Sequence, residues 1–94
     1  MENNNISEAL KIYHYRDWSW EMADDNFGGR YNKAKAEMKD FVALVSAIES
    51  AEVRNALRRM WTLRYEELQA SYMGNKFSAE EELKDLESRF AYAA

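Results

Sequence analysis

The chain has no cysteine, no proline and only three glycines among its 94 residues. The lack of cysteine excludes disulfide bonds and thiolate metal sites. The lack of proline leaves long stretches with nothing to interrupt a helix. The glycines form two turn signals, Gly28 with Gly29 and Gly74 before Asn75. This composition predicts long helices joined by few turns.

Long hydrophobic runs are also missing. No apolar stretch approaches the roughly 18 residues that a membrane span needs. The segment Met1–Asn5 lacks the basic and apolar regions of a secretory signal. The length is that of one domain. We therefore expect a single helical domain over residues 1–94, cytoplasmic and without a membrane partner, with residues 1–5 frayed.

Signatures of the common enzyme classes are absent from the sequence. The segment Phe27–Arg30 lacks the lysine and the spacing of a phosphate-binding loop. The single histidine, His14, has no nucleophile motif around it, and a chain of this size has little room for a deep pocket. We expect no catalysis and no cofactor.

The chain is rich in apolar residues at helical spacing, and four segments show it. These segments cover residues 6–24, 31–49, 51–72 and 78–92. The stripe of the second segment is the clearest and is expected to be buried: Tyr31, Ala34, Met38, Phe41, Val42, Val45 and Ile48. The pattern predicts an all-α fold, a small up-and-down bundle of three to four helices.

Serine residues mark where two of these helices are expected to begin. Ser50 is a good N-cap for the third segment, with Glu52 in its first turn. Ser78 opens a capping box that ends at Glu81, just before the apolar pattern of the fourth segment. With the turn at Gly74, the fourth helix is expected to fold back on the third as an antiparallel hairpin.

The first segment has features of both a strand and a helix. Residues 12–20 are rich in aromatic side chains and partly alternate, which is typical of a strand. A lone strand has no second strand-like run to pair with. Helical spacing also places Ile12, Tyr15, Trp18 and Met22 on one stripe. We predict a helix.

Residues 31–72 contain no glycine or proline, so either one long helix or two helices fit the composition. The apolar stripe before Ser50 and the stripe after it are offset by roughly 120° at 100° per residue. A straight helix would then bury two different faces, whereas a bend near Ser50 turns both inward. We favour two helices.

Acidic residues follow His14 on one face of the first segment. His14, Asp17 and Glu21 are spaced so that they share this face, with Asp24 or Asp25 beyond them. Imidazole and carboxylates in such an arrangement can hold a divalent metal. Carboxylate-bridged bundles need a second histidine, which this chain lacks. We therefore predict no metal site and favour a solvated acidic face, although the sequence leaves the question open.

Four arginines fall within the third segment, although the formal net charge of the chain is −4. Arg54, Arg58, Trp61 and Tyr65 share a face, and arginines beside aromatic rings can contact phosphates and bases. The first and fourth segments carry an acidic excess, so these arginines are expected to pair within the chain. Binding of nucleic acid through the Arg54–Arg64 helix is the alternative hypothesis.

Aromatic residues are the last abundant feature, with three tryptophans, six tyrosines and four phenylalanines. Most are expected in the core, but the first segment carries more than one face can bury. Tyrosine, tryptophan and arginine are enriched in protein interfaces. The candidate partner-binding residues are Tyr15, Trp18, Trp20, Arg58 and Trp61. We expect a non-enzymatic protein-interaction or regulatory module whose partner is another protein or a second copy, as in a homodimer.

Overall fold

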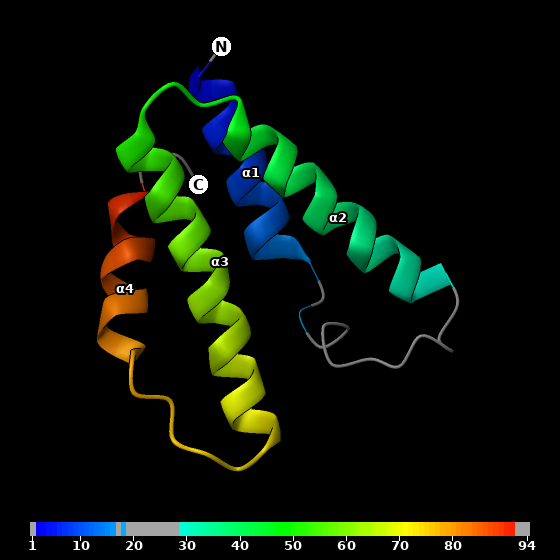
Figure 1. Ribbon diagram of the computed structural model, residues 1–94, viewed down its shortest axis with the longest axis vertical. Helices are drawn as coiled ribbons and strands as arrows, with labels where there is room; N and C mark the ends of the chain where they lie inside the picture. Colours follow the sequence, from blue (N-terminus) through cyan, green and yellow to red (C-terminus); the bar gives the residue numbers. More distant parts are fainter. Residues whose placement is uncertain (1, 17, 19–28, 92–94) are drawn as a thin grey trace.

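The computed structural model describes residues 2–16, 18 and 29–91. These residues form four α-helices and no strand, which confirms the predicted all-α bundle. The helices are α1 (Glu2–Tyr15), α2 (Gly29–Ser46), α3 (Ala51–Tyr72) and α4 (Glu80–Arg89). Figure 1 shows that successive helices run in alternating directions, as in an up-and-down bundle. In the part of the chain described, no helix is long and apolar enough to cross a membrane.

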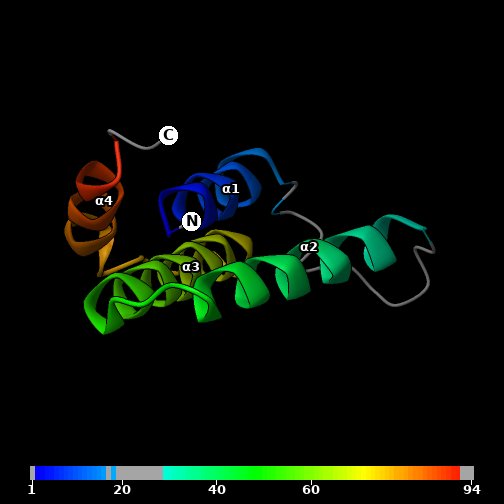
Figure 2. The same cartoon turned by 90° about the horizontal axis from the view of Figure 1, so that it is seen from above.

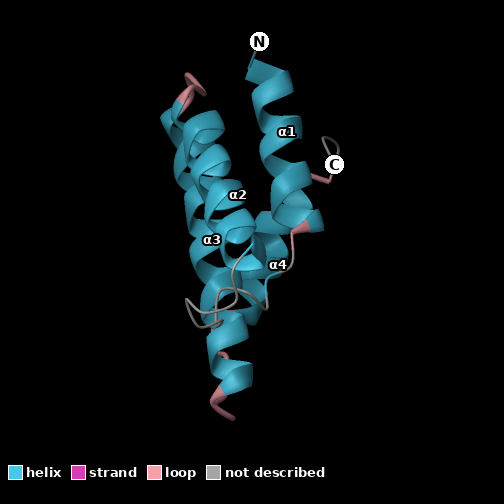
Figure 3. Cartoon of the chain, turned by 90° about the vertical axis from the view of Figure 1, so that its right-hand side faces the viewer, coloured by secondary structure: helices cyan, strands magenta, loops and turns pink. Residues whose placement is uncertain are grey.

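The helices lie in two layers, with α2 and α3 in one and α1 and α4 in the other (Figures 2 and 3). Helix α1 packs mainly on α2, and α4 packs mainly on α3. Helices α2 and α3 meet near the linker that joins them and diverge from there (Figure 1). The divergence leaves part of α2 without a neighbouring helix on its α3 side.

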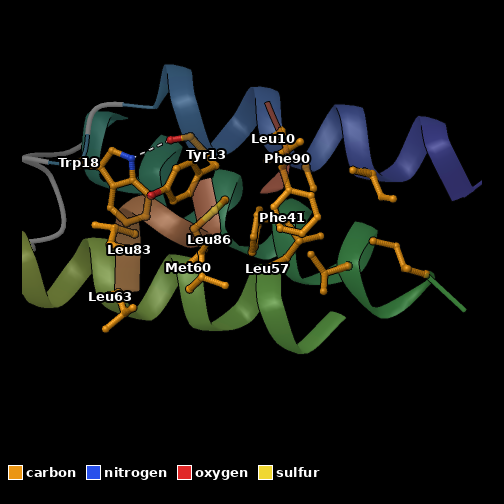
Figure 4. Packing of buried hydrophobic residues seen from close by; sticks show 14 residues of the cluster. Leu10, Tyr13, Trp18, Phe41, Leu57, Met60, Leu63, Leu83, Leu86 and Phe90 are labelled. Carbon is orange, nitrogen blue, oxygen red and sulfur yellow. Dashed lines mark hydrogen bonds between the residues drawn. The ribbon is translucent and has the colours of Figure 1, made fainter. Parts of the chain in front are cut away.

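The hydrophobic core lies between the two layers and draws on all four helices (Figure 4). Burial of these apolar side chains is the main stabilising contribution to a fold without disulfides. Its members are Ile6, Ala9, Leu10, Tyr13, Trp18, Phe41, Val45, Ile48, Leu57, Met60, Leu63, Leu83, Leu86 and Phe90. Two members of the predicted α2 stripe, Met38 and Val42, are instead exposed, which corrects the prediction that they are buried.

Residues 31–72 form two helices, α2 and α3, rather than one, as predicted from the offset of the apolar stripes. Ser50 caps α3, because its hydroxyl oxygen accepts a hydrogen bond of 3.2 Å from the backbone N–H of Val53. The Arg54 guanidinium donates to the carbonyl of Ile48 and, at 2.8 Å, to that of Glu49. These bonds hold the linker against the first turn of α3, and the predicted range 51–72 is confirmed residue for residue.

The predicted limits of the first helix were wrong at both ends. Helix α1 begins at Glu2, so residues 2–5 are helical rather than frayed. It ends at Tyr15, and Arg16 lies in a bend. The ring N–H of Trp18 donates to the carbonyl of Tyr13 at 2.8 Å and so satisfies one of the carbonyls that a helix end leaves open. Asp17 and residues 19–24 of the predicted helix lie outside the described residues.

The fourth helix begins two residues later than predicted. Helix α4 starts at Glu80 after Ala79, which makes no side-chain capping bond, so the expected capping role of Ser78 was wrong. Three glutamates in its first turn interact favourably with the helix dipole instead. The turn before it is as predicted, with Gly74 at a φ of 71° and the N–H of Asn75 donating to Ala70 at 2.7 Å. Helices α3 and α4 form the expected antiparallel hairpin (Figure 1).

Candidate protein-binding surface

Two of the predicted partner-binding residues, Trp18 and Trp61, lie against each other. Their ring centroids are 4.6 Å apart, and the Phe41 ring lies 4.3 Å from that of Trp61. Trp18 is only 6% exposed and belongs to the core (Figure 4). Trp61 is half-buried and packs on that core. Trp18 therefore does not reach the surface, which corrects its assignment as a partner-contacting residue.

Arg16 lies over the rings of both tryptophans. Its guanidinium carbon is 4.6 Å from the Trp18 ring centroid and 4.5 Å from that of Trp61. The side chain is buried and donates to the carbonyl of Ala34 at 3.4 Å. The electron-rich faces of two indoles stabilise a cation held in this way. Arg16 thus ties the end of α1 to α2 and α3, a role that the sequence analysis did not assign to it.

Tyr13 joins α1 to α4 in the same part of the core. Its hydroxyl donates to a carboxylate oxygen of Glu87 at 2.8 Å. Burial of the ring and this hydrogen bond raise the pKa of the Tyr13 phenol well above its ordinary value. The group therefore stays protonated at neutral pH, and its contacts fit a structural role.

The arginines of α3 make contacts within the chain. Arg54 binds carbonyls of the linker, as described above, and Arg59 forms two hydrogen bonds of 2.9 and 3.1 Å with Glu82 on α4. Arg64 pairs with Glu67 at 2.9 Å, and its guanidinium carbon lies 5.6 Å from the Trp18 ring centroid. These contacts disfavour a nucleic-acid interface built on the whole helix. That alternative remains a prediction.

The other predicted residues do not form one cluster. Tyr15 is 85% exposed at the end of α1. Arg58 is exposed, and its Nη2 atom lies 3.5 Å from the hydroxyl oxygen of Ser46 on α2. Trp20 lies outside the described residues.

The acidic face proposed for a metal falls mostly on residues that the structure does not describe. His14 is exposed on α1. Asp17, Glu21, Asp24 and Asp25 all lie outside the described ranges. Within those ranges, no group of three or more histidine, aspartate or glutamate side chains could hold a metal ion.

Helix α2 presents a surface that combines apolar and basic side chains. Lys35, Met38, Lys39 and Val42 follow the i, i+3, i+4, i+7 spacing that places them on one side of the helix. Met38 is 40% exposed and Val42 is 53% exposed, and both lysines are exposed. Ser46 lies one turn further along the same side of α2, and its contact with Arg58 places that arginine of α3 at the end of this side. We call these four residues and Arg58 the α2 surface.

Two of the hollows on the described part of the molecule lie away from the α2 surface. The first, the α1–α2 groove, has a volume of about 450 Å³ and is lined by Asn5, Glu8, Ile12, Asp40, Ala43, Leu44 and Ala47. The second, of about 430 Å³, lies by the turn between α3 and α4, next to the exposed side chain of Met73. Neither hollow contains an arrangement of groups typical of a catalytic centre.

No protein-family model, no curated protein and no solved structure matches the chain.

Proposed function

We propose that the chain is a protein-binding module and that the α2 surface is where it contacts its partner. The observation that carries the proposal is the exposure of Met38 and Val42, two apolar side chains one helical turn apart. Isolated exposed apolar residues are common on protein surfaces. Here, however, the two are adjacent and have lysines beside them, and Arg58 lies at one end.

This combination supports binding to a protein. Interfaces combine an apolar centre with a polar rim, and methionine and arginine are enriched in them. Basic side chains at the rim favour an acidic partner, because complementary charges speed encounter and disfavour partners of the same charge. We therefore propose a partner segment that carries apolar side chains beside carboxylates.

Site-specific photo-crosslinking tests the proposal. A photoreactive phenylalanine analogue replaces Val42 in one variant and Ser71 in a control, in cells that express the chain from its own gene. Ser71 is also exposed but lies at the far end of α3. We expect protein adducts from position 42 that disappear when Lys39→Glu is added, and none from position 71. Equal adducts from both positions, or none from position 42, would contradict the proposal.

A further inference from the structure

The α1–α2 groove has the chemistry that the α2 surface requires of a partner. Its lining includes the half-buried apolar side chains of Ile12 and Leu44 and the exposed carboxylates of Glu8 and Asp40. Glu8 pairs with Lys11 at 3.2 Å, in a contact that is exposed on both sides. Such an exposed ion pair contributes little to stability, so Glu8 can pair with a basic side chain of another molecule at little cost.

The groove and the α2 surface are two sides of one helix. Asp40, Ala43, Leu44 and Ala47 repeat the i, i+3, i+4, i+7 spacing of the α2 surface five positions further along. At 100° per residue, five positions rotate the pattern by about 140°. The two surfaces of one molecule therefore point in different directions and cannot meet each other. They can meet only between two molecules.

We infer that the partner of the α2 surface is a second copy of this chain, which contributes its α1–α2 groove. This inference rests on the proposed function. Apolar side chains meet apolar side chains in this arrangement, and lysines face carboxylates. Because the two surfaces of one molecule point about 140° apart around α2, a single partner fills only one of them. The contact is therefore heterologous and leaves one free surface of each kind on a pair.

The carboxylates of α4 are a poorer match for the α2 surface. Glu82, Glu80 and Asp85 form exposed ion pairs with Arg59, Lys84 and Arg89, of the same kind as the Glu8–Lys11 pair, so the difference lies in the apolar contacts. The residues between them on the exposed side of α4 are polar or charged. Helix α4 therefore offers acidic groups without the apolar contact that Met38 and Val42 require.

Sedimentation velocity of the full chain over a concentration series tests the inference. At an ionic strength of about 0.01 M, where the Debye length is about 30 Å, we expect the average mass to rise with concentration. At about 1 M, where that length is about 3 Å, we expect weaker association. A chain that stays monomeric throughout the low-salt series would overturn the inference.

Two variants at neighbouring positions then test whether the contact joins unlike surfaces. Val42→Glu blocks the α2 surface and leaves the groove intact, whereas Ala43→Lys blocks the groove and leaves the α2 surface intact. Both positions are exposed, and thermal melting followed by circular dichroism checks that both variants fold. Ser71→Glu, which makes the same charge change as Val42→Glu away from both surfaces, is expected to associate as the unmodified chain does.

We expect each blocked variant alone to be monomeric and their equimolar mixture to form a dimer that does not grow further. The intact groove of one variant then binds the intact surface of the other. A mixture that remains monomeric would overturn the inference. So would unchanged association of Ala43→Lys, since that result means that the α2 surface pairs with itself or binds elsewhere.

The crosslinking experiment separates this inference from the proposed function. Adducts of two copies of the chain at position 42 support both. Adducts with a different protein, together with a monomeric chain in sedimentation, overturn the second-copy inference and support the proposed function. The absence of any adduct at position 42 contradicts both.

Discussion

Among single residues, Tyr15 and Trp18 show how burial separates two aromatic side chains that lie close in the sequence. Helical spacing placed them on one stripe, but α1 ends at Tyr15, so this spacing does not apply to Trp18. Trp18 turns into the core and Tyr15 faces solvent. At this helix end the Trp18 ring donates a hydrogen bond to the carbonyl of Tyr13, a contact that residue spacing alone does not reveal.

Replacing Trp18 is expected to destabilise the fold. We expect Trp18→Ala to lower the free energy of unfolding by about 3–5 kcal/mol, as is typical of a large buried aromatic residue. Tyr15→Ala, at an exposed position, is expected to change it by less than about 0.5 kcal/mol. Urea unfolding followed by circular dichroism measures both values. Similar values for the two variants would show that Trp18 is not part of the core.

Tyr13 gives the fold a dependence on alkaline pH. Because the pKa of the phenol is raised in the folded chain, the folded state binds this proton more tightly than the unfolded state does. The stabilisation is complete below the unfolded pKa of about 10 and decreases as the pH rises above it.

The comparison with Tyr13→Phe tests this dependence. We expect the unmodified chain to lose more unfolding free energy between pH 9 and pH 11, as ordinary tyrosine pKa values lie near pH 10. Urea unfolding at each pH measures the loss. Parallel losses in the two proteins would show that the Tyr13 phenol titrates normally in the folded chain.

Among the helices, boundaries could be predicted where local side-chain chemistry sets them. The limits of α3 follow from the Ser50 cap and from the turn at Gly74, both of which are visible in the sequence. Ser78 has the same capping signature, but the first turn of α4 forms without it. A capping motif identifies a residue that is able to cap a helix. Whether that residue makes the capping hydrogen bond depends on the geometry of the preceding turn.

The two serines form a matched pair for a stability test. We expect Ser50→Ala to lower the free energy of unfolding by about 1 kcal/mol, because the N–H of Val53 loses its acceptor. Ser78→Ala is expected to change it by less than about 0.5 kcal/mol. Urea unfolding of both variants provides the measurement. A larger loss for Ser78→Ala than for Ser50→Ala would contradict the assigned caps.

At the scale of the whole molecule, the fold could be predicted from the sequence more fully than the candidate surface. Apolar periodicity and the scarcity of glycine and proline were sufficient to predict an all-α bundle. The same periodicity placed Met38 and Val42 in the core. Both are exposed in the structure, and α2 and α3 diverge away from their linker (Figure 1), an arrangement that apolar periodicity does not reveal.

The arginines of α3 show the same dependence on packing. The sequence grouped them on a face that suited either internal pairing or nucleic acid. In the structure, Arg59 reaches α4 and Arg54 reaches the linker, whereas Arg58 remains at the surface beside α2. Only the arrangement of the helices distinguishes Arg58, which lies beside α2, from the arginines that contact α4 and the linker.

Photo-crosslinking at Val42 tests the central claim, that the α2 surface binds a protein, more directly than any other measurement. The account predicts defined protein adducts at position 42 that Lys39→Glu removes, and no adducts at position 71. Adducts that persist in Lys39→Glu, or that form equally at position 71, would contradict it.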